Sequence, residues 1–505
     1  MDGPLWSRQP SWTVNGGLEH VGEQATAPPR RKMTMVVVLV LVVLTLLVAL
    51  VVRVAQVETQ RPAATPARAL GPTARYVPDS EARSRLAEDL VQRREDAVRN
   101  GDAQAWLADI DPANAGLLAQ ERMRFDNLRQ FRFTTFDLRI EVESGPSSTA
   151  SRPAGPLRLH GWVHLFMRFA EDVQLSMVKY DYTLVFDNGR AVVAAIDAWD
   201  NVTAGPYAPE LDKAAGHNVP WDLVALRSAR GQRVTVLAPT ADRWDPAVYL
   251  PAAQRAEALV RSLWKDRPGP SGFLVFLADD RQFAQWFNSK ETSKAVVGYA
   301  TFTPMVDTNT LQRLKRPNFD HKPDEPAWDE ISAGARIVLR MSAMHSTAYA
   351  EQVLAHEMAH AVGTNVIQTL RTDESEGATN QPSWAVEGFA RYVEHLAAPG
   401  SATRALAAVR RAWPKYKPTG DRILPASNGF YSKNNNQMSF NYNLGSSMFH
   451  AADKVGGRQK AVALYIAVSN NWQMLSESKM FLDITISQAG LNPARFWRTH
   501  KTLVR

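Results

Sequence analysis

Residues 349–363 read Y-A-E-Q-V-L-A-H-E-M-A-H-A-V-G, and this stretch decides how the C-terminal half of the chain folds. Its apolar residues recur at helical spacing, which predicts an α-helix. Ser346 or Thr347 can cap the start of this helix, and Gly363 supplies its end. The helix is too apolar for the protein surface, so we expect other elements to cover it.

The same helix carries an H-E-x-x-H motif. His356 and His360 are four residues apart, so both imidazoles leave one face of the helix and can bind one ion. Glu357 lies beside them, where it is placed to take a proton from a metal-bound water. The alternative is a polar surface helix with two histidines of no function, and the apolar neighbours of the motif disfavour it.

A third ligand is expected on another element, because a catalytic zinc site combines three protein ligands with one open position. Residues 382–394 read P-S-W-A-V-E-G-F-A-R-Y-V-E, which predicts a second apolar helix that contains Glu387. Burying an unpaired carboxylate is costly, so Glu387 needs a partner. Glu387 is either the third ligand of a Zn²⁺ ion, as we predict, or an ordinary glutamate of an amphipathic helix.

The motif H-E-M-A-H followed by W-A-V-E-G-F-A resembles the gluzincin zinc metallopeptidases, especially the membrane-anchored bacterial peptidase MA-like family with its W-x-x-E-G-x-A motif. The resemblance covers about residues 230–470. It implies a thermolysin-like domain, Zn²⁺ held by both histidines and Glu387, and Glu357 as the general base. It also implies a short strand at the rim of the cleft, for which residues 336–341 are the match.

A further match lies at residues 441–445, N-Y-N-L-G. Aminopeptidase-type gluzincins carry a Y-x-x-G helix start whose tyrosine donates to the oxyanion, which implies this role for Tyr442. The alternative is a tyrosine that packs against a neighbouring element at the start of a helix.

Three features depart from the family pattern. The loop between His360 and Glu387 has 26 residues, which is long for a gluzincin. Relatives often have an acidic residue where this chain has Arg391, so Glu394 or another group must orient a zinc histidine. No G-x-M-E-N segment precedes the motif, which argues against a standard aminopeptidase.

Composition limits the other functions. A chain of 505 residues can hold two or three domains. The net charge of +7 is spread along the sequence, so we expect no nucleic-acid partner. The chain has no cysteine, which excludes disulfides, thiolate catalysis and cysteine-based zinc sites.

The N-terminal region predicts a membrane anchor. Residues 33–52 are 20 residues without a charge, about the length that spans a bilayer, and three basic residues precede them. We expect a disordered cytoplasmic tail (1–32), a transmembrane helix in the lipid bilayer (33–52) and a Pro/Ala-rich linker (53–79). The C-terminal domains would then be extracellular.

Two α+β domains are predicted after the linker. Residues 80–205 begin with a charged helix and continue as strand-like runs at 131–143, 157–169, 173–186 and 190–197. The D-N-G at 187–189 predicts a tight hairpin, and this order resembles NTF2-like or cystatin-like domains. His160 and His164 share one of these strands, a pattern that does not favour a metal site.

Residues 206–505 form the predicted metallopeptidase domain, a short sheet followed by a mainly helical subdomain. We therefore expect a membrane-anchored zinc metallopeptidase that acts on a peptide or protein substrate. The alternative is a non-catalytic binding protein on a peptidase-like fold, which acts through residues 80–205.

Overall fold

The computed structural model of the chain describes residues 79–143, 156–187, 189–198, 218–289, 295–304, 332–369, 382–418, 424–425, 430–432, 434–471 and 479–505. The predicted tail and membrane span lie outside these residues, as does the predicted linker except for Asp79. The predicted domain boundary between residues 205 and 206 also lies outside them and stays a prediction.

Among the described residues, no helix corresponds to the expected membrane helix. Each helix of the described residues is too short or too polar to cross a lipid bilayer. Residues 33–52, on which the expectation depended, are not among the described residues. We therefore correct the assignment of a single-pass, outward-facing membrane protein and do not carry it further.

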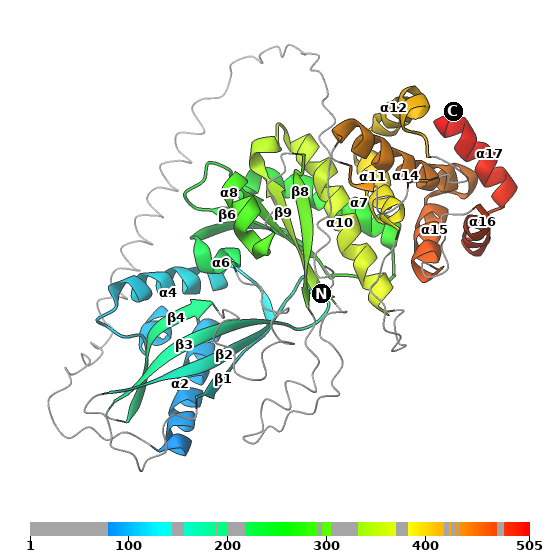
Figure 1. Cartoon of the computed structure of the whole chain (residues 1–505). Helices are drawn as coiled ribbons and strands as arrows, with labels where there is room; N and C mark the ends of the chain where they lie inside the picture. The colour runs from blue at the N-terminus through cyan, green and yellow to red at the C-terminus, as the bar shows by residue number, and fades with distance from the viewer. Residues whose placement is uncertain are drawn as a thin grey trace, which may run out of the picture. The chain divides into compact units, whose positions relative to one another are not determined.

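The first part of the described chain is a helical layer against an antiparallel sheet (Figure 1). Its helices are α2 (Ser80–Asn100), α3 (Ala103–Leu107) and α4 (Ala115–Leu128). Its strands are β1 (Phe133–Val142), β2 (Leu157–Phe169), β3 (Ser176–Asp187) and β4 (Arg190–Ala198), paired in chain order. The register joins Asp187 to Arg190, which confirms the tight hairpin predicted from D-N-G.

Local signals set the ends of α2. Asp79 accepts the backbone N–H of Ala82 at 2.8 Å, which satisfies one of the free donors at the helix start. Gly101 ends the helix in the left-handed region at φ 69°, a conformation that glycine adopts without steric cost.

The second sheet contains β5 (Leu226–Arg230), β6 (Val234–Pro239), β7 (Phe273–Ala278), β8 (Gly298–Pro304) and β9 (Ser332–Arg340). Their order is β5-β6-β7-β9-β8, and β6, β7 and β9 are parallel. The helix α7 (Pro246–Trp264) connects β6 to β7 and packs on the sheet. The described fold is therefore mixed α/β, and the predicted α+β class is wrong for this sheet.

The strand expected at the rim of the cleft, residues 336–341, corresponds to the end of β9. This strand lies inside the sheet, between β7 and β8. Among the described strands β8 is the outer one on this side, and it runs antiparallel to β9. Strand order depends on pairing between distant segments, which periodicity along the chain does not reveal.

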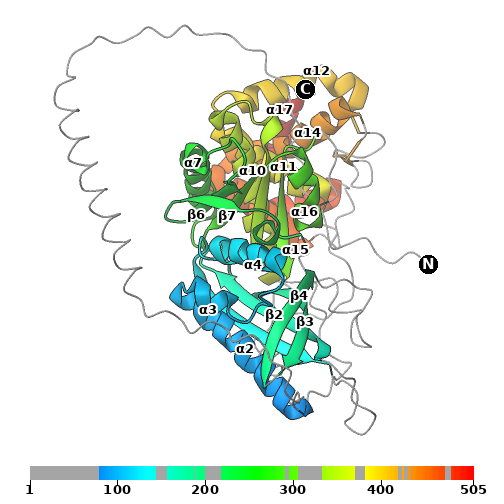
Figure 2. The same ribbon diagram turned by 90° about the vertical axis from the view of Figure 1, so that its left-hand side faces the viewer.

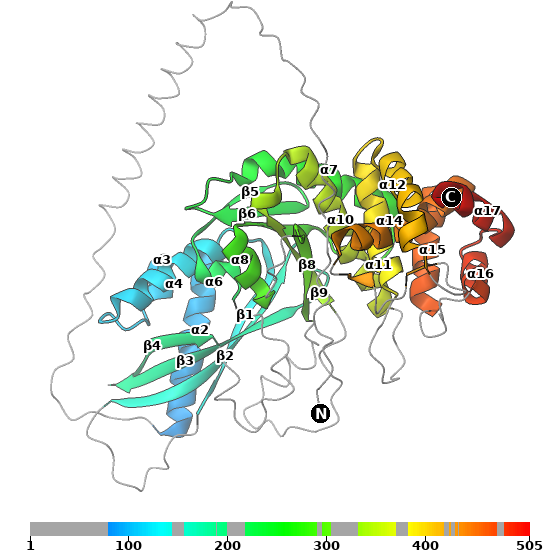
Figure 3. The ribbon, with the colours of Figure 1, turned by 45° about the horizontal axis from the view of Figure 1, so that its top comes forward.

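Helices make up the rest of the described chain. The longer ones are α10 (Thr347–Thr369), α11 (Ser383–Ala397), α12 (Ser401–Tyr416), α14 (Asn435–Gly456), α15 (Arg458–Asn471), α16 (Lys479–Gln488) and α17 (Pro493–Val504). The short ones are α6 (Pro220–Leu223), α8 (Asp280–Gln285), η2 (Trp286–Asn288) and η3 (Met341–Ala343). Figures 2 and 3 show α10, α11 and α14 side by side.

The two sheets meet at the turn between β2 and β3. Asp172 in this turn forms a bidentate ion pair with Arg336 of β9, at 2.6 Å and 2.9 Å. The backbone N–H groups of Val173 and Gln174 both donate to the carbonyl oxygen of Ala333. The antiparallel sheet is thus fixed to the strand that leads into α10.

Candidate metal centre

The helix α10 presents the H-E-x-x-H motif inside the protein. Ser346 caps it, because its Oγ accepts the backbone N–H of Tyr349 at 3.1 Å. Every residue from 353 to 363 is buried, as the apolar sequence predicts. The two histidines and Glu357 therefore lie in the core, where a charged or polar group needs a partner.

The predicted end of this helix is wrong. Gly363 does not stop α10, which continues to Thr369. A Cβ atom at Gly363 would lie 2.5 Å from the hydroxyl oxygen of Tyr465 in α15. The glycine therefore permits a close side-chain contact between helices, a function that its position in the sequence does not reveal.

A close crossing of α11 and α14 brings Glu387 and Tyr442 to the motif. A Cβ atom at Gly388 would lie 2.5 Å from the carbonyl carbon of Gly445, so the two backbones are in contact. Tyr442 lies inside α14, which begins at Asn435, and the predicted helix start at Y-x-x-G is therefore wrong. The glycine of this motif instead permits the helices to cross next to Glu387 and Tyr442.

Three side chains converge on one point. The Nε2 atoms of His356 and His360 each lie 3.4 Å from Oε2 of Glu387, and the three ligand atoms are within 4.8 Å of one another. The 3.4 Å between each Nε2 and Oε2 of Glu387 is longer than a charge-assisted hydrogen bond. The Nε2 of His356 and the Oε2 of Glu387 make no hydrogen bond, which is rare for buried polar atoms.

Imidazole nitrogens and a carboxylate oxygen are common ligands of divalent metals. The buried group formed by His356, His360 and Glu387 can therefore hold a metal ion. Among the residues that the structure describes, it is the one group of three or more potential ligand side chains.

The charges around this point favour a cation. Burial lowers the pKa of His356, but Glu387, Glu394 and Glu357 together raise it more, to about 9. Burial raises the pKa of Glu387, while the two histidines lower it more, to about 2. Glu387 thus stays ionised and attracts positive charge, which either a proton on His356 or a metal ion can supply.

Glu394 supports His356 from the side away from the other ligands. The Nδ1 atom of His356 lies 3.0 Å from Oε2 of Glu394. Arg391 donates from Nη1 to the other oxygen of Glu394 and from Nε to Oδ1 of Asn443, at 3.2 Å in the second bond. Burial raises the pKa of Glu394, but Arg391 and His356 lower it more, to about 2.

This arrangement shows which carboxylate contacts His356 in a chain that has Arg391 where relatives often have an acidic residue. Metal-binding histidines usually give their second nitrogen to a carboxylate, and Glu394 makes that contact here. Arg391 anchors Glu394 and does not take its place. The carboxylate that orients His356 therefore lies one helical turn after Arg391, at Glu394, which the sequence analysis gave as a candidate.

Glu357 lies fully buried beside both histidines. A Cβ atom at Gly298 would be 3.0 Å from Oε1 of Glu357, so the first residue of β8 lies directly against this carboxylate. The strand β8 therefore contacts the motif at Glu357.

Two tyrosines flank the ligands. The ring of Tyr442 stacks on His356 with 6.3 Å between the ring centroids, and its buried hydroxyl makes no hydrogen bond. Burial and the charge of Glu387 raise the pKa of Tyr442, so the hydroxyl keeps its proton. Tyr431 donates its hydroxyl hydrogen to Oε1 of Glu387 at 2.8 Å.

Sequence reasoning missed Tyr431. It lies in residues 430–432, between α12 and α14, and no motif or spacing connects it to the histidines. An aromatic residue in a polar loop was the sole signal, and that signal does not identify a function.

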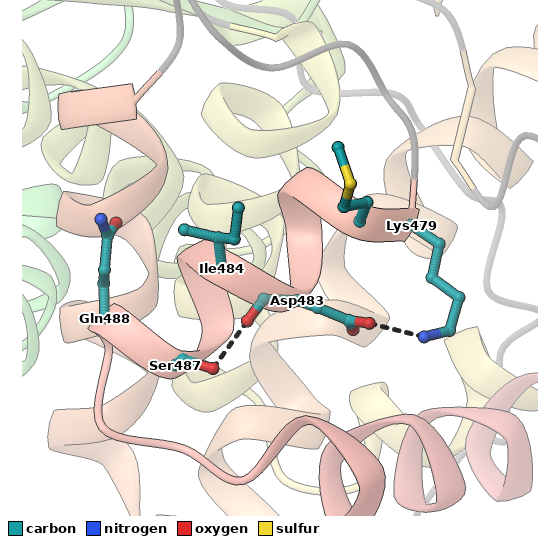
Figure 4. Close-up of a pocket in the computed structure, with 6 residues that line it drawn as sticks. Lys479, Asp483, Ile484, Ser487 and Gln488 are labelled. Carbon is teal, nitrogen blue, oxygen red and sulfur yellow. Dashed lines mark hydrogen bonds and ion pairs between the residues drawn. The ribbon is translucent and has the colours of Figure 1, made fainter.

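Other candidate positions do not join this site. His160 pairs with Asp181 at 3.0 Å on the surface of the first sheet. His164 is buried in the same strand, where burial and Lys179 lower its pKa to about 3. A surface hollow along α16 is lined by side chains of that helix alone, including Lys479, Asp483 and Ile484 (Figure 4). It contains none of the predicted site residues.

No family model and no curated protein matches this chain.

Proposed function

We propose that the chain is a zinc-dependent hydrolase that cleaves peptide bonds, with a catalytic domain of the gluzincin type. The observation that carries the proposal is the buried convergence of His356, His360 and Glu387, with Glu357 beside them. Two imidazoles and one carboxylate are a ligand set of catalytic zinc in peptidases, and they leave one position open. The charge of the surrounding carboxylates supports a divalent ion.

The residues divide the work of the proposed reaction. When bound, zinc would polarise the scissile carbonyl and make water a better nucleophile. Glu357 would accept the proton of the attacking water and return it to the leaving amine. Glu394 would keep His356 in the tautomer whose Nε2 faces the ion, because it accepts the hydrogen of Nδ1.

Tyr442 is the proposed donor to the carbonyl oxygen as that oxygen becomes negative. Its hydroxyl is buried, makes no hydrogen bond and keeps its proton. A donor of this kind stabilises the transition state more than the substrate, because it is already oriented in a site without water.

A binding protein on the same scaffold is the competing function, acting through the first sheet and its helices. Arg391 was the reason to consider it, because an arginine there could have displaced the carboxylate behind His356. The bond from Arg391 to Glu394 removes this reason.

The test is Glu357→Gln in the full chain, measured by zinc content and by hydrolysis of a peptide library. Zinc content should stay near the wild-type value, and the rate should fall by about 10²-fold or more. Glu351→Gln is the matched control on α10, since Glu351 pairs with Arg255 away from the motif. Equal hydrolysis by the wild type and Glu357→Gln would reject catalysis at this site in favour of the binding function.

Tyr442→Phe extends the same test. Its rate should fall less than that of Glu357→Gln, and its zinc content should not change, because it removes a donor and no ligand. A loss of zinc from this variant would contradict the role proposed for Tyr442.

A further inference from the structure

Tyr431 reaches the metal ligand Glu387 from the solvent side. About 37% of the residue is exposed, whereas the three ligands and Tyr442 are buried. Its hydroxyl nevertheless extends inward and donates to Oε1 of Glu387 at 2.8 Å. The other oxygen of the same carboxylate, Oε2, is the one that faces both histidines.

The segment that carries Tyr431 is fixed to the start of α14. Asn441 donates from Nδ2 to the carbonyl oxygen of Phe430 at 2.8 Å. Ser432 donates from Oγ to Oε1 of Gln437 at 3.2 Å and accepts the backbone N–H of Asn434 at 3.1 Å. These bonds fix the backbone on both sides of Tyr431, and its ring contacts the rings of Phe430 and Tyr442. The hydroxyl is therefore a positioned donor.

We propose that Tyr431 is a positioning residue that sets the orientation of Glu387 toward the metal. The inference rests on the metal site of the proposed function. A glutamate carboxylate rotates easily about its last bond, because that torsion is broad. A fixed hydroxyl on Oε1 restricts this rotation and leaves Oε2 as the oxygen available to the ion.

The two tyrosines therefore have different roles. Tyr431 uses its hydroxyl on a ligand, and it acts through Glu387 and not on the substrate. Tyr442 makes no hydrogen bond with its hydroxyl and stays available for the reacting carbonyl. Groups that orient metal ligands typically change metal affinity by about 10- to 100-fold when they are removed.

The experiment measures zinc affinity of the full-length Tyr431→Phe variant by competition with a chromophoric chelator. Tyr392→Phe is the matched control. Tyr392 lies in α11, and its hydroxyl donates to Oδ2 of Asp453 at 2.9 Å, so this variant also loses one hydroxyl–carboxylate bond. Zinc affinity should fall about 10-fold or more in Tyr431→Phe and stay at the wild-type value in Tyr392→Phe.

The visible absorption of the Co²⁺-substituted proteins gives a second readout that a general loss of stability does not move. A Glu387 carboxylate that is free to bind through both oxygens changes the coordination number, so the cobalt spectrum of Tyr431→Phe should differ from wild type. Tyr392→Phe should keep the wild-type spectrum.

The possible failures are distinguishable. A wild-type chain that binds no zinc would reject the proposed function and this inference together. A wild-type chain that binds zinc, with Tyr431→Phe within twofold of its affinity, would reject the role of Tyr431 alone. An equal loss of affinity in Tyr392→Phe would also reject it, because the effect would then be structural.

Discussion

The Asp172–Arg336 pair and the His356–His360–Glu387 group are both charged and both buried, yet their contacts differ. In the pair, the guanidinium and the carboxylate meet in two hydrogen bonds at 2.6 Å and 2.9 Å. Each charge has its partner within the protein, which is the usual condition for burying an ion pair.

The side chains of His356, His360 and Glu387 do not join in direct hydrogen bonds of this kind. Oε2 of Glu387 lies 3.4 Å from Nε2 of both histidines. Among the described residues, the carboxylates of Glu357, Glu387 and Glu394 outnumber the guanidinium of Arg391, which pairs with Glu394. The structural ion pair joins its two charges in direct hydrogen bonds, whereas the binding site keeps Nε2 of His356 and Oε2 of Glu387 directed at a position that a ligand can fill. The difference supports a structural role for the first cluster and a metal site for the second.

Breaking the closed pair should give the largest effect on stability. Asp172→Asn removes one charge and leaves the Arg336 guanidinium buried without its counter-ion. The free energy of unfolding should fall by about 3–5 kcal/mol, measured by urea denaturation.

A double variant checks the cause of that loss. Asp172→Leu combined with Arg336→Met removes both charges, so it should be more stable than Asp172→Asn, because no unpaired charge remains. A loss below about 1 kcal/mol in Asp172→Asn would show that the pair is not a closed structural contact.

Zinc should stabilise the folded chain through the His356–His360–Glu387 group and not through the Asp172–Arg336 pair. At a free zinc concentration of 100 times Kd, the unfolding free energy of the wild type should rise by about 2.7 kcal/mol, because the ion binds the folded chain. Glu387→Ala should lose this increase, and Asp172→Asn should keep it. Thermal unfolding with zinc and with a chelator measures both.

The opposite pattern would reverse the comparison. If Glu387→Ala were stabilised by zinc as much as the wild type, the ion would bind elsewhere on the chain. A zinc effect that disappeared in Asp172→Asn would show that the two clusters are coupled.

Local sequence patterns predicted much of the His356–His360–Glu387 group. The i, i+4 histidines predicted one helix face, and apolar neighbours predicted its burial, because both depend on residues within a few turns. The structure has His356 and His360 at equal distance from Glu387, the carboxylate that the sequence proposed as third ligand. Glu394 was found in the same way, one turn after Arg391.

Long-range features could not be derived from the same signals. Arg336 lies 164 positions from Asp172, and nothing near either residue indicates the other. The interior position of β9, the contact of Gly363 with Tyr465, and the bond from Tyr431 to Glu387 also depend on how distant segments pack. A residue pattern reports the local conformation that it favours and does not report its eventual neighbours.

His500 is a third kind of buried polar group, a histidine that stays neutral, and it can be compared with the ion pair and the metal group. His500 of α17 is 3% exposed, and its Nε2 lies 2.8 Å from Oγ of Ser447 in α14. Burial and the nearby charge of Arg505 lower its pKa to about 4. In contrast to His356, it has no carboxylate partner among the described residues that would hold a proton on the ring.

The neutral His500 predicts that the unfolding free energy depends on pH, by less than the changes expected for Asp172→Asn and for zinc binding. Between pH 6.5 and pH 4 the unfolded chain binds a proton at His500 that the folded chain excludes, so the unfolding free energy falls as the pH falls. The contribution is complete above pH 6.5, and about 2 kcal/mol of it should be lost at pH 5. His500→Gln should therefore lose about 2 kcal/mol less than the wild type between pH 7 and pH 5, measured by urea denaturation. The contributions of the other residues are the same in both proteins and cancel in this difference. Equal pH dependence would therefore show that His500 is not held neutral by its surroundings.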